Sequence, residues 1–204
     1  RGNMKKKGFL VTIAAPSGSG KSTILNKVMQ KLPQIRYSIS HTTRLPRGEE
    51  QDGVAYFFTN EEDFLKKKDA GFFLECAKVH NNWYGTSKDF INRTLEDANH
   101  VIMDIDVQGV SQIKKLGVDI VSIFVLPPEF RILKQRLIDR KTDSPEQIEQ
   151  RLENSKKEID RLNEYDYLVI NDSLDNAVER VINIIQAEEN KVKRFVNVLD
   201  DFYK

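Results

Sequence analysis

The sequence predicts an α/β protein whose core is a parallel sheet. Short apolar runs rich in β-branched residues recur at 9–14, 101–106, 120–126 and 167–170, and helical patterns separate them, as in successive βαβ units. The first run leads into a glycine-rich segment that opens a helical pattern. Two segments interrupt this alternation. Residues 38–95, rich in aromatic and turn residues, predict a mixed α/β insert, and the highly charged residues 136–162 predict a solvated helical hairpin.

The individual elements have local signals. The run from Phe9 to Ala14 is typical of a buried parallel strand. Residues 22–32 place apolar side chains at helical spacing and stop at Pro33, which predicts a helix. Within the charged segment, the sequence SPEQ at 144–147 indicates a capped helix start. Residues 175–204 predict one or two terminal amphipathic helices.

Composition limits the classes of function. The chain has 204 residues and a net charge of +1, so it lacks the basic excess of a nucleic-acid or membrane-surface binder. No apolar run approaches the roughly 20 residues that span a bilayer, and no signal peptide is visible. Cys76 is the single cysteine, which excludes an internal disulfide. We expect a cytoplasmic protein without an obligatory protein partner, and residues 1–3, which precede Met4, are expected to be a cloning remnant.

The segment APSGSGKS at 15–22 has nearly the form GxxxxGK[ST], with Ala15 in place of the first glycine. It follows a strand and opens a helix, as a phosphate-binding loop must. In such a loop Lys21 reaches the β- and γ-phosphates and the Ser22 hydroxyl binds Mg²⁺. Gly18 and Gly20 are expected to need positive φ, whereas Ala15 can be accommodated at the strand exit. We predict a functional loop; the alternative is a chance turn before a helix.

A second anion site is predicted around Pro46. Arg44 and Arg47 flank this proline and could grip one anion bidentately, with hydroxyl donors from Tyr56 and Tyr84. The alternative is that both arginines are ordinary solvated surface residues. Beside a competent phosphate loop, a second anion site indicates a donor phosphate and an acceptor phosphate.

Five blocks in one order resemble the guanylate kinases, which transfer the γ-phosphoryl group of ATP to GMP. They are APSGSGKS, SISHTTRLPRGEEQDGVAYFF, FLECAKVHNNWYGT, VIMDIDVQG and LVINDSLDNA. The resemblance spans about residues 8–190. It implies a P-loop NTPase-type core of about 8–37, 96–135 and 163–204, an NMP-binding insert of about 38–95 and a lid of about 136–162.

The resemblance also implies roles for individual residues, with ATP, GMP or dGMP as ligands and Mg²⁺ as cofactor. It assigns ATP binding to Ala15, Pro16, Ser17, Gly18, Ser19, Gly20, Lys21, Ser22, Thr23 and Asn171. It assigns GMP binding to Ser40, Arg44, Arg47, Tyr56, Glu75, Tyr84, Thr86 and Asp104. The catalytic set is Lys21, Arg44, Arg136, Arg140 and Arg151. Ser22 would bind Mg²⁺, with Asp104 and Asp106 acting through water.

The chemistry suits these residue types. Guanine presents N1–H and N2–H₂ donors beside the O6 acceptor, which match the Glu75 carboxylate and the Ser40 hydroxyl. Adenine would instead place its N1 acceptor against the carboxylate. In-line phosphoryl transfer needs positioning and charge neutralisation more than a strong base, so we assign no general base.

The sequence departs from the family pattern at several positions. Gly48 is shifted by one place, and Ala55 stands where an aspartate is common. Lys141 replaces a glycine in the lid. His80 and Asn81 replace a residue and a glycine, and Asn81 can still adopt a left-handed conformation.

Each assignment has a structural alternative. Glu75 could be a surface carboxylate, Asp104 and Asp106 strand-end caps, and the lid arginines partners of Glu149 and Glu153. Two other functions also compete with a GMP kinase: a non-catalytic interaction module on the same fold, and a kinase for another nucleotide or sugar phosphate. The intact loop favours an enzyme, and the pair Ser40 and Glu75 favours guanine.

Overall fold

The core is a five-stranded parallel sheet in the order β2-β7-β1-β8-β9. The computed structural model describes residues 5–79, 81–139 and 144–203. The central strand β1 pairs in register with its two neighbours, Leu10 lying opposite Val101 and Ile120. The predicted parallel α/β fold is therefore confirmed. The strands are β1 (Leu10–Ala14), β2 (Ile35–Tyr37), β7 (His100–Met103), β8 (Ile120–Leu126) and β9 (Tyr167–Ile170).

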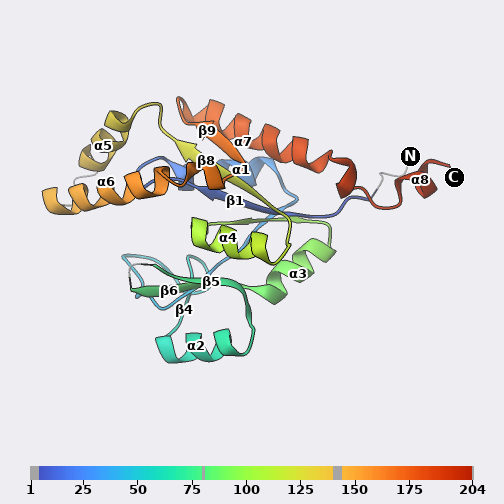
Figure 1. Ribbon diagram of the computed structural model, residues 1–204, viewed down its shortest axis with the longest axis horizontal. Helices are drawn as coiled ribbons and strands as arrows, with labels where there is room; N and C mark the ends of the chain where they lie inside the picture. The colour runs from blue at the N-terminus through green and yellow to red at the C-terminus, as the bar shows by residue number, and fades with distance from the viewer. Residues whose placement is uncertain (1–4, 80, 140–143, 204) are drawn as a thin grey trace.

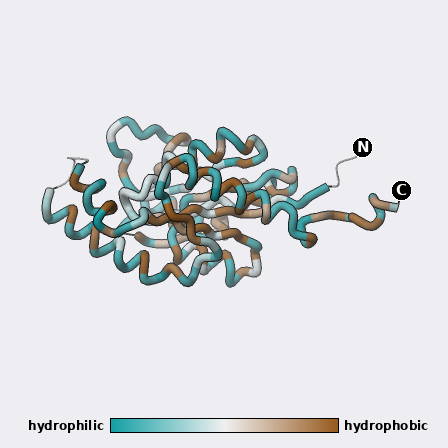
Figure 2. The backbone as a smooth tube through the Cα atoms, turned by 90° about the horizontal axis from the view of Figure 1, so that it is seen from above, coloured by the Kyte–Doolittle hydropathy of each residue, from teal (hydrophilic) through white to brown (hydrophobic). Residues whose placement is uncertain are grey.

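Helices cover both faces of this sheet (Figure 1). On one face lie α1 (Lys21–Lys31) and α7 (Leu174–Glu189), and on the other α3 (Lys88–Glu96) and α4 (Val107–Lys115). Because successive strand residues point to opposite faces, Val11 packs with α1 and α7 while Leu10 packs with α3 and α4. Figure 2 shows the hydrophobic segments gathered along the middle of the body.

A second, four-stranded sheet lies below the core in Figure 1, in the order β4-β3-β6-β5. Its strands are β3 (His41–Thr42), β4 (Phe57–Phe58), β5 (Phe73–Val79) and β6 (Asn82–Ser87), with α2 (Glu61–Asp69) between β4 and β5. Phe64 of α2 is fully buried against Phe73 and Trp83, and this stacking fastens the helix to the sheet. These elements lie within the range of about 38–95 predicted for the insert, but the last residues of that range form α3, which packs on the core sheet.

The charged segment forms a helical hairpin beside the phosphate loop. Its helices are α5 (Phe130–Asp139) and α6 (Pro145–Ile159), followed by η1 (Leu162–Glu164). The predicted capped start of α6 is confirmed, because Ser144 and Gln147 form a capping box with a proline in the first turn. Helix α5 begins six residues before the predicted boundary at 136, since its first turns carry the core residue Leu133.

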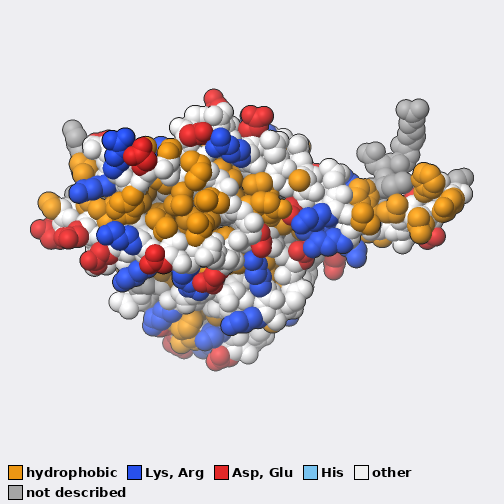
Figure 3. Space-filling view, turned by 45° about the horizontal axis from the view of Figure 1, so that its top comes forward, with side chains coloured by type: hydrophobic (Ala, Val, Ile, Leu, Met, Phe, Trp, Pro, Cys, Tyr) orange, Lys and Arg blue, Asp and Glu red, His pale blue; other side chains and the backbone are white. Residues whose placement is uncertain are grey.

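The C-terminal segment returns to the N-terminus and then projects from the body (Figures 1 and 3). After α7 come η2 (Val192–Arg194) and the short helix α8 (Val198–Phe202), so the predicted terminal helices are present. The main chain of Lys7 donates to Arg194 O at 2.7 Å, and Val196 N donates to Lys5 O at 2.9 Å. Within the described residues, no helix is long and apolar enough to cross a membrane.

One strand prediction needs correction, and one strand was not predicted. The strand expected at 101–106 ends at Met103, because Asp106 accepts a hydrogen bond from Gly109 N at 3.0 Å and caps α4 instead. Strand β2 had no sequence prediction. It has three residues, and Arg36 at its centre is exposed, so it lacks a continuous apolar run.

Candidate functional site

The glycine-rich loop connects the end of β1 at Ala14 to the start of α1 at Lys21. Gly18 and Gly20 have φ of 92° and 85°, which confirms the predicted left-handed positions. Gly20 is the N-cap of α1, so the loop carries its main-chain N–H groups to the positive end of a helix dipole. Residues 15–23 and Glu158 line a cavity of about 380 Å³ there.

Ala15 occupies the position of the missing glycine. It directly follows β1, is half-buried and packs against the core cluster between the sheet and helices α1 and α7. A small side chain fits this position, and the substitution removes no main-chain donor. The loop conformation therefore tolerates the departure from the motif.

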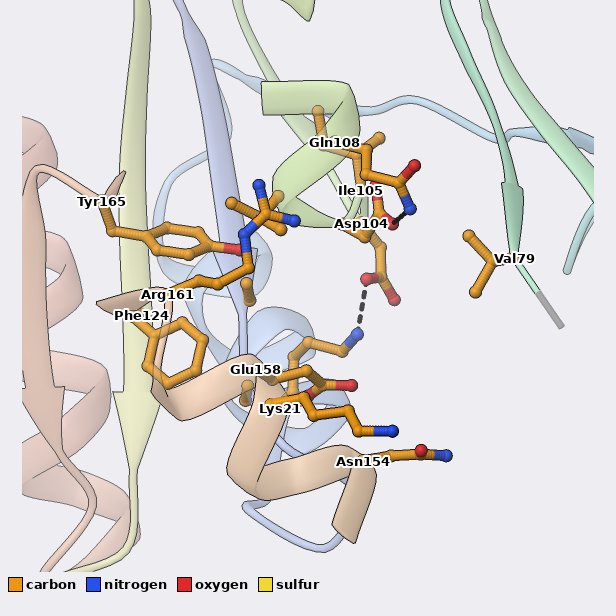
Figure 4. A pocket seen from close by; sticks show the side chains of 15 residues that line it. Lys21, Val79, Asp104, Ile105, Gln108, Phe124, Asn154, Glu158, Arg161 and Tyr165 are labelled. Atoms are coloured by element: carbon orange, nitrogen blue, oxygen red, sulfur yellow. Dashed lines mark hydrogen bonds and ion pairs between the residues drawn. The ribbon is translucent and has the colours of Figure 1, made fainter. Parts of the chain in front are cut away.

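Lys21 lies where three cavities meet. It lines the loop cavity, a cavity of about 220 Å³ above the second sheet and one of about 310 Å³ beside α6. Its Nζ atom lies 2.5 Å from Asp104 Oδ1 (Figure 4). This ion pair holds the lysine side chain across the end of the core sheet, between the loop and the insert.

The oxygen atoms near Lys21 suit a magnesium ion. Ser22 is exposed at the first turn of α1, and Asp104 and Asp106 line the neighbouring cavities. No cluster of three or more histidine, cysteine or acidic residues that could hold a metal occurs in the described part of the chain. Mg²⁺ prefers few protein oxygens together with water and phosphate oxygens, so the residues present fit it.

The cavity of about 220 Å³ combines residues from the insert and the core: Lys21, Ser40, Tyr56, Glu75, Ala77, Val79, Tyr84, Asp104, Ile105 and Asp106. Glu75 is 5% exposed and accepts a hydrogen bond from Thr86 Oγ1 at 2.6 Å. Burial raises the pKa of Glu75 to about 7, and the nearby charge of Asp106 acts in the same direction. The surface-carboxylate alternative for Glu75 is therefore wrong, and Thr86 contacts this carboxylate.

Neither of the two predicted phosphate-binding arginines, Arg44 and Arg47, lines this cavity. Arg44 Nη2 donates to both carboxylate oxygens of Glu50, at 3.0 and 2.9 Å, and its guanidinium lies 5.2 Å from the Tyr56 ring centre. Arg47 is exposed, and its main-chain N–H donates to Glu50 at 2.8 Å. Glu50 thus holds the Arg44 guanidinium and the main chain at Arg47. This role was not predictable from the sequence, because a lone glutamate in a polar loop carries no signal.

The hairpin brings Arg136 and Arg151 to the loop from two helices. Arg151 Nη1 donates to Ser17 Oγ at 3.0 Å. Arg136 lines a cavity of about 450 Å³ together with Gly18, Gly20, Thr23, Asp139, Asn171 and Leu174. Arg140 and Lys141 lie outside the described residues, as does His80.

Asn171 also reaches the phosphate loop. It is buried at the end of β9, and its Nδ2 donates to the main-chain oxygen of Ser19 at 2.8 Å. Its amide lies so close to Gly20 that a Cβ built there would approach Nδ2 to 3.0 Å. Asn171 therefore supports the loop as well as lining the cavity beside it.

A group of polar residues beside Lys21 was not singled out from the sequence. Figure 4 shows Asn154, Glu158, Arg161 and Tyr165 around the cavity of about 310 Å³, opposite Asp104. They come from α6 and the segment after it, where polar and charged residues fill most positions outside the stripe of Ile148, Leu152 and Ile159, so the sequence offers no contrast that would mark them. Asn81, in the turn before β6, has φ of 69° and confirms the predicted left-handed residue.

The arrangement defines a class of protein: a P-loop nucleotide-binding fold with an insert and a helical hairpin around one lysine. The guanylate kinase family model matches residues 7–188, and the chain belongs to the guanylate kinase family of nucleoside monophosphate kinases.

Named relatives support this membership. The chain is 41% identical to a guanylate kinase of Thermotoga maritima over 96% of this chain and 95% of that protein. It is 46% identical to one of Hahella chejuensis over 89% and 88%. A crystal structure of guanylate kinase from Anaplasma phagocytophilum superposes with a TM-score of 0.81 at 28% identity, covering 97% and 95% of the two chains.

Proposed function

We propose that the protein transfers the γ-phosphoryl group of ATP to GMP or dGMP, giving ADP and the diphosphate. The observation that carries this proposal is the position of Lys21, which lines both the loop cavity and the cavity that contains the buried Glu75. A donor phosphate on the loop and an acceptor nucleotide in the insert would therefore meet at one cation.

The acceptor cavity has the donor and acceptor pattern of a guanine site. Ionised Glu75 accepts from guanine N1–H and N2–H₂, and the Ser40 hydroxyl lies in the same cavity to serve O6. Thr86 occupies one lone pair of Glu75 and so leaves the other oxygen for the base. Adenine N1 would meet this carboxylate without a proton to share, which disfavours AMP.

Positioning and charge neutralisation account for the transfer step. The loop and Lys21 bind the donor phosphates, and Arg44, Arg47, Tyr56 and Tyr84 bind the acceptor phosphate. Ser22, with Asp104 and Asp106 through water, would hold Mg²⁺, which neutralises charge on the phosphate oxygens when bound. No residue is needed as a strong base, because the acceptor oxygen already belongs to a phosphate.

The hairpin serves the donor side. Arg151 already contacts Ser17 of the loop, and Arg136 lines the cavity next to it. We propose that these arginines, with Arg140, stabilise charge on the transferring group and that the hairpin excludes water from it. Excluding water prevents the hydrolysis of ATP in place of transfer.

A coupled assay of ADP release tests the function with ATP, Mg²⁺ and each of AMP, CMP, UMP, GMP and dGMP. We expect turnover with GMP and dGMP and little with the other three. Preference for another monophosphate would reassign the acceptor cavity. Nucleotide binding without any turnover would support the non-catalytic module instead.

A further inference from the structure

Strand β5, which carries Glu75, is an edge strand, and a side chain of the core forms hydrogen bonds to its free edge. In the described part of the chain, strand β5 pairs with β6 alone in the second sheet, and α4 of the core lies along its other side (Figure 1). Gln112 of α4 donates through Nε2 to Cys76 O at 2.8 Å and accepts through Oε1 from Cys76 N at 3.1 Å. One side-chain amide therefore takes the place of a neighbouring strand at this residue.

Helix α4 also packs directly against the Glu75 carboxylate. A Cβ built on Gly109 would lie 2.7 Å from Glu75 Oε2, so the helix backbone passes directly beside this oxygen. Thr86 Oγ1 holds the other oxygen at 2.6 Å. The carboxylate is thus fixed between β6 and the first turn of α4, and its place depends on how closely α4 and β5 approach.

The pairing of β5 with β6 does not by itself fix the distance between α4 and β5. The pairing of β5 with β6 contains a register shift between Phe73 and Glu75, immediately before the carboxylate. Such an irregularity loosens the ladder locally. The two bonds of Gln112 act at the next residue, Cys76, and tie the strand to the core at the point where the ladder is irregular.

We propose that Gln112 is a positioning residue for Glu75 that sharpens the choice of guanine. The inference rests on the proposed function of the acceptor cavity. By clamping Cys76, Gln112 holds the Glu75 carboxylate at a fixed distance from the core, where it can accept both guanine N–H groups at once. Without the clamp the strand moves away from α4, and the two-point contact with N1 and N2 becomes a looser one.

Discrimination between GMP and IMP reports this role directly. Hypoxanthine lacks the N2 amine, so IMP offers the carboxylate N1–H alone. Gln112→Ala removes both bonds to Cys76, and Gln112→Met removes them while keeping the length of the side chain. For both variants we expect KM for GMP to rise about tenfold, which corresponds to the loss of one hydrogen bond of ordinary strength between Glu75 and the base. The ratio of kcat/KM for GMP to that for IMP should fall several-fold, with kcat and KM for ATP within about twofold of wild type.

Lys115→Ala, an exposed change on the same helix, is the matched control and should leave every parameter unchanged. Circular dichroism and thermal unfolding show whether each variant folds. An unchanged GMP-to-IMP ratio in folded Gln112→Met would overturn the inference. This holds whether both kcat/KM values stay at the wild-type level or fall equally, since equal losses indicate a purely structural clamp. Wild-type enzyme that fails to phosphorylate GMP would instead overturn the proposed function, so the two failures are distinct.

Discussion

The donor and acceptor sides of the site are built in opposite ways. The donor side is a continuous stretch, residues 15–23, between one strand and one helix of the core. The acceptor side draws its residues from the start of the insert, β5, β6 and the end of β7, spread over residues 40–106. Local backbone geometry suffices to bind a phosphate, whereas reading a base needs side chains from several elements.

The two sides also differ in their electrostatics. The donor side offers main-chain N–H groups, a helix N-terminus and Lys21. The acceptor side buries a carboxylate whose pKa is raised to about 7. The groups that bind an anion on the donor side also belong to the regular fold. The carboxylate that contacts the base must be buried, and burying its charge lowers the free energy of unfolding.

The largest effect is expected on the donor side, from Lys21→Ala. Loss of this charge removes the cation common to both cavities and leaves Asp104 without its partner. We expect kcat to fall by at least about a thousandfold, as for the loss of a preorganised charge at a transferring group. Steady-state kinetics and a thermal melt measure this.

Lys27→Ala is the control for that substitution, because it removes a lysine of the same helix that forms a surface ion pair with Asp175. It should be nearly silent. Activity of Lys21→Ala within a few-fold of wild type would mean that the loop is not the donor site.

The next effect concerns base choice on the acceptor side. Glu75→Gln keeps an acceptor for Thr86 but replaces the charged acceptor for guanine with an amide that satisfies one donor well. We expect kcat/KM for GMP to fall about 30- to 1000-fold, since a charge-assisted pair in a buried site is lost. Turnover of AMP should fall much less, and KM for ATP should hardly change.

The exposed carboxylate of Glu62, on α2, offers the matched change Glu62→Gln, which should leave both monophosphates unaffected. Equal losses for GMP and AMP in Glu75→Gln would place base reading elsewhere. The comparison of the two sides would then fail on the acceptor side alone.

Sequence and structure agree best where signals are local. Gly18 and Gly20, the capping box of α6 and strands β8 and β9 follow from short-range chemistry, and the structure has them where they were expected. The strand before Asp104 was predicted too long, because the pattern of apolar residues continues to Ile105 while a cap at Asp106 ends it.

Side-chain contacts within irregular loops or between distant segments were not predictable in this way. Arg44 Nη2 donates to both carboxylate oxygens of Glu50 within one irregular loop, and the clamp from Gln112 to Cys76 joins residues 36 positions apart. Neither glutamate nor glutamine stands out in a polar stretch. Their roles depend on which elements the fold brings side by side, and periodicity does not contain that information.

The pH dependence of KM should differ between the two substrates, with a change of about tenfold for GMP and a much smaller one for ATP. Because burial raises the pKa of Glu75 to about 7, the unbound protein holds a proton there at pH 6 and releases it by pH 8. Guanine needs the ionised form, so KM for GMP should rise about tenfold from pH 8 to pH 6. KM for ATP should change much less over the same range. Parallel curves for both substrates would show that the titrating group is not specific to the acceptor side.

The same group predicts a stability effect in the ligand-free protein. The pKa of Glu75 is raised from its ordinary 4.5 to about 7 in the folded state, so the folded state binds more protons than the unfolded state in this window. The free energy of unfolding therefore falls as pH rises from about 4.5 to 7. Glu75→Gln should remove this loss, stabilising the protein at pH 8 by up to roughly 3 kcal/mol and by little at pH 5. Denaturant melts at both pH values would show no such difference if Glu75 were solvated.

The smallest effect returns to the donor side, with Asn171→Ala. The Asn171 amide is buried and donates to Ser19 O at 2.8 Å, so the alanine variant leaves a buried loop carbonyl without its side-chain donor. We expect a loss of about 1–2 kcal/mol in the free energy of unfolding and a rise in KM for ATP of about three- to tenfold. KM for GMP should stay within twofold, because the acceptor cavity shares no wall with this contact. Asp172→Ala is the matched control, since that exposed neighbour forms a surface ion pair with Arg180. Equal increases of KM for ATP and KM for GMP in Asn171→Ala would mean that the donor and acceptor sides are coupled through the core sheet and are not independent.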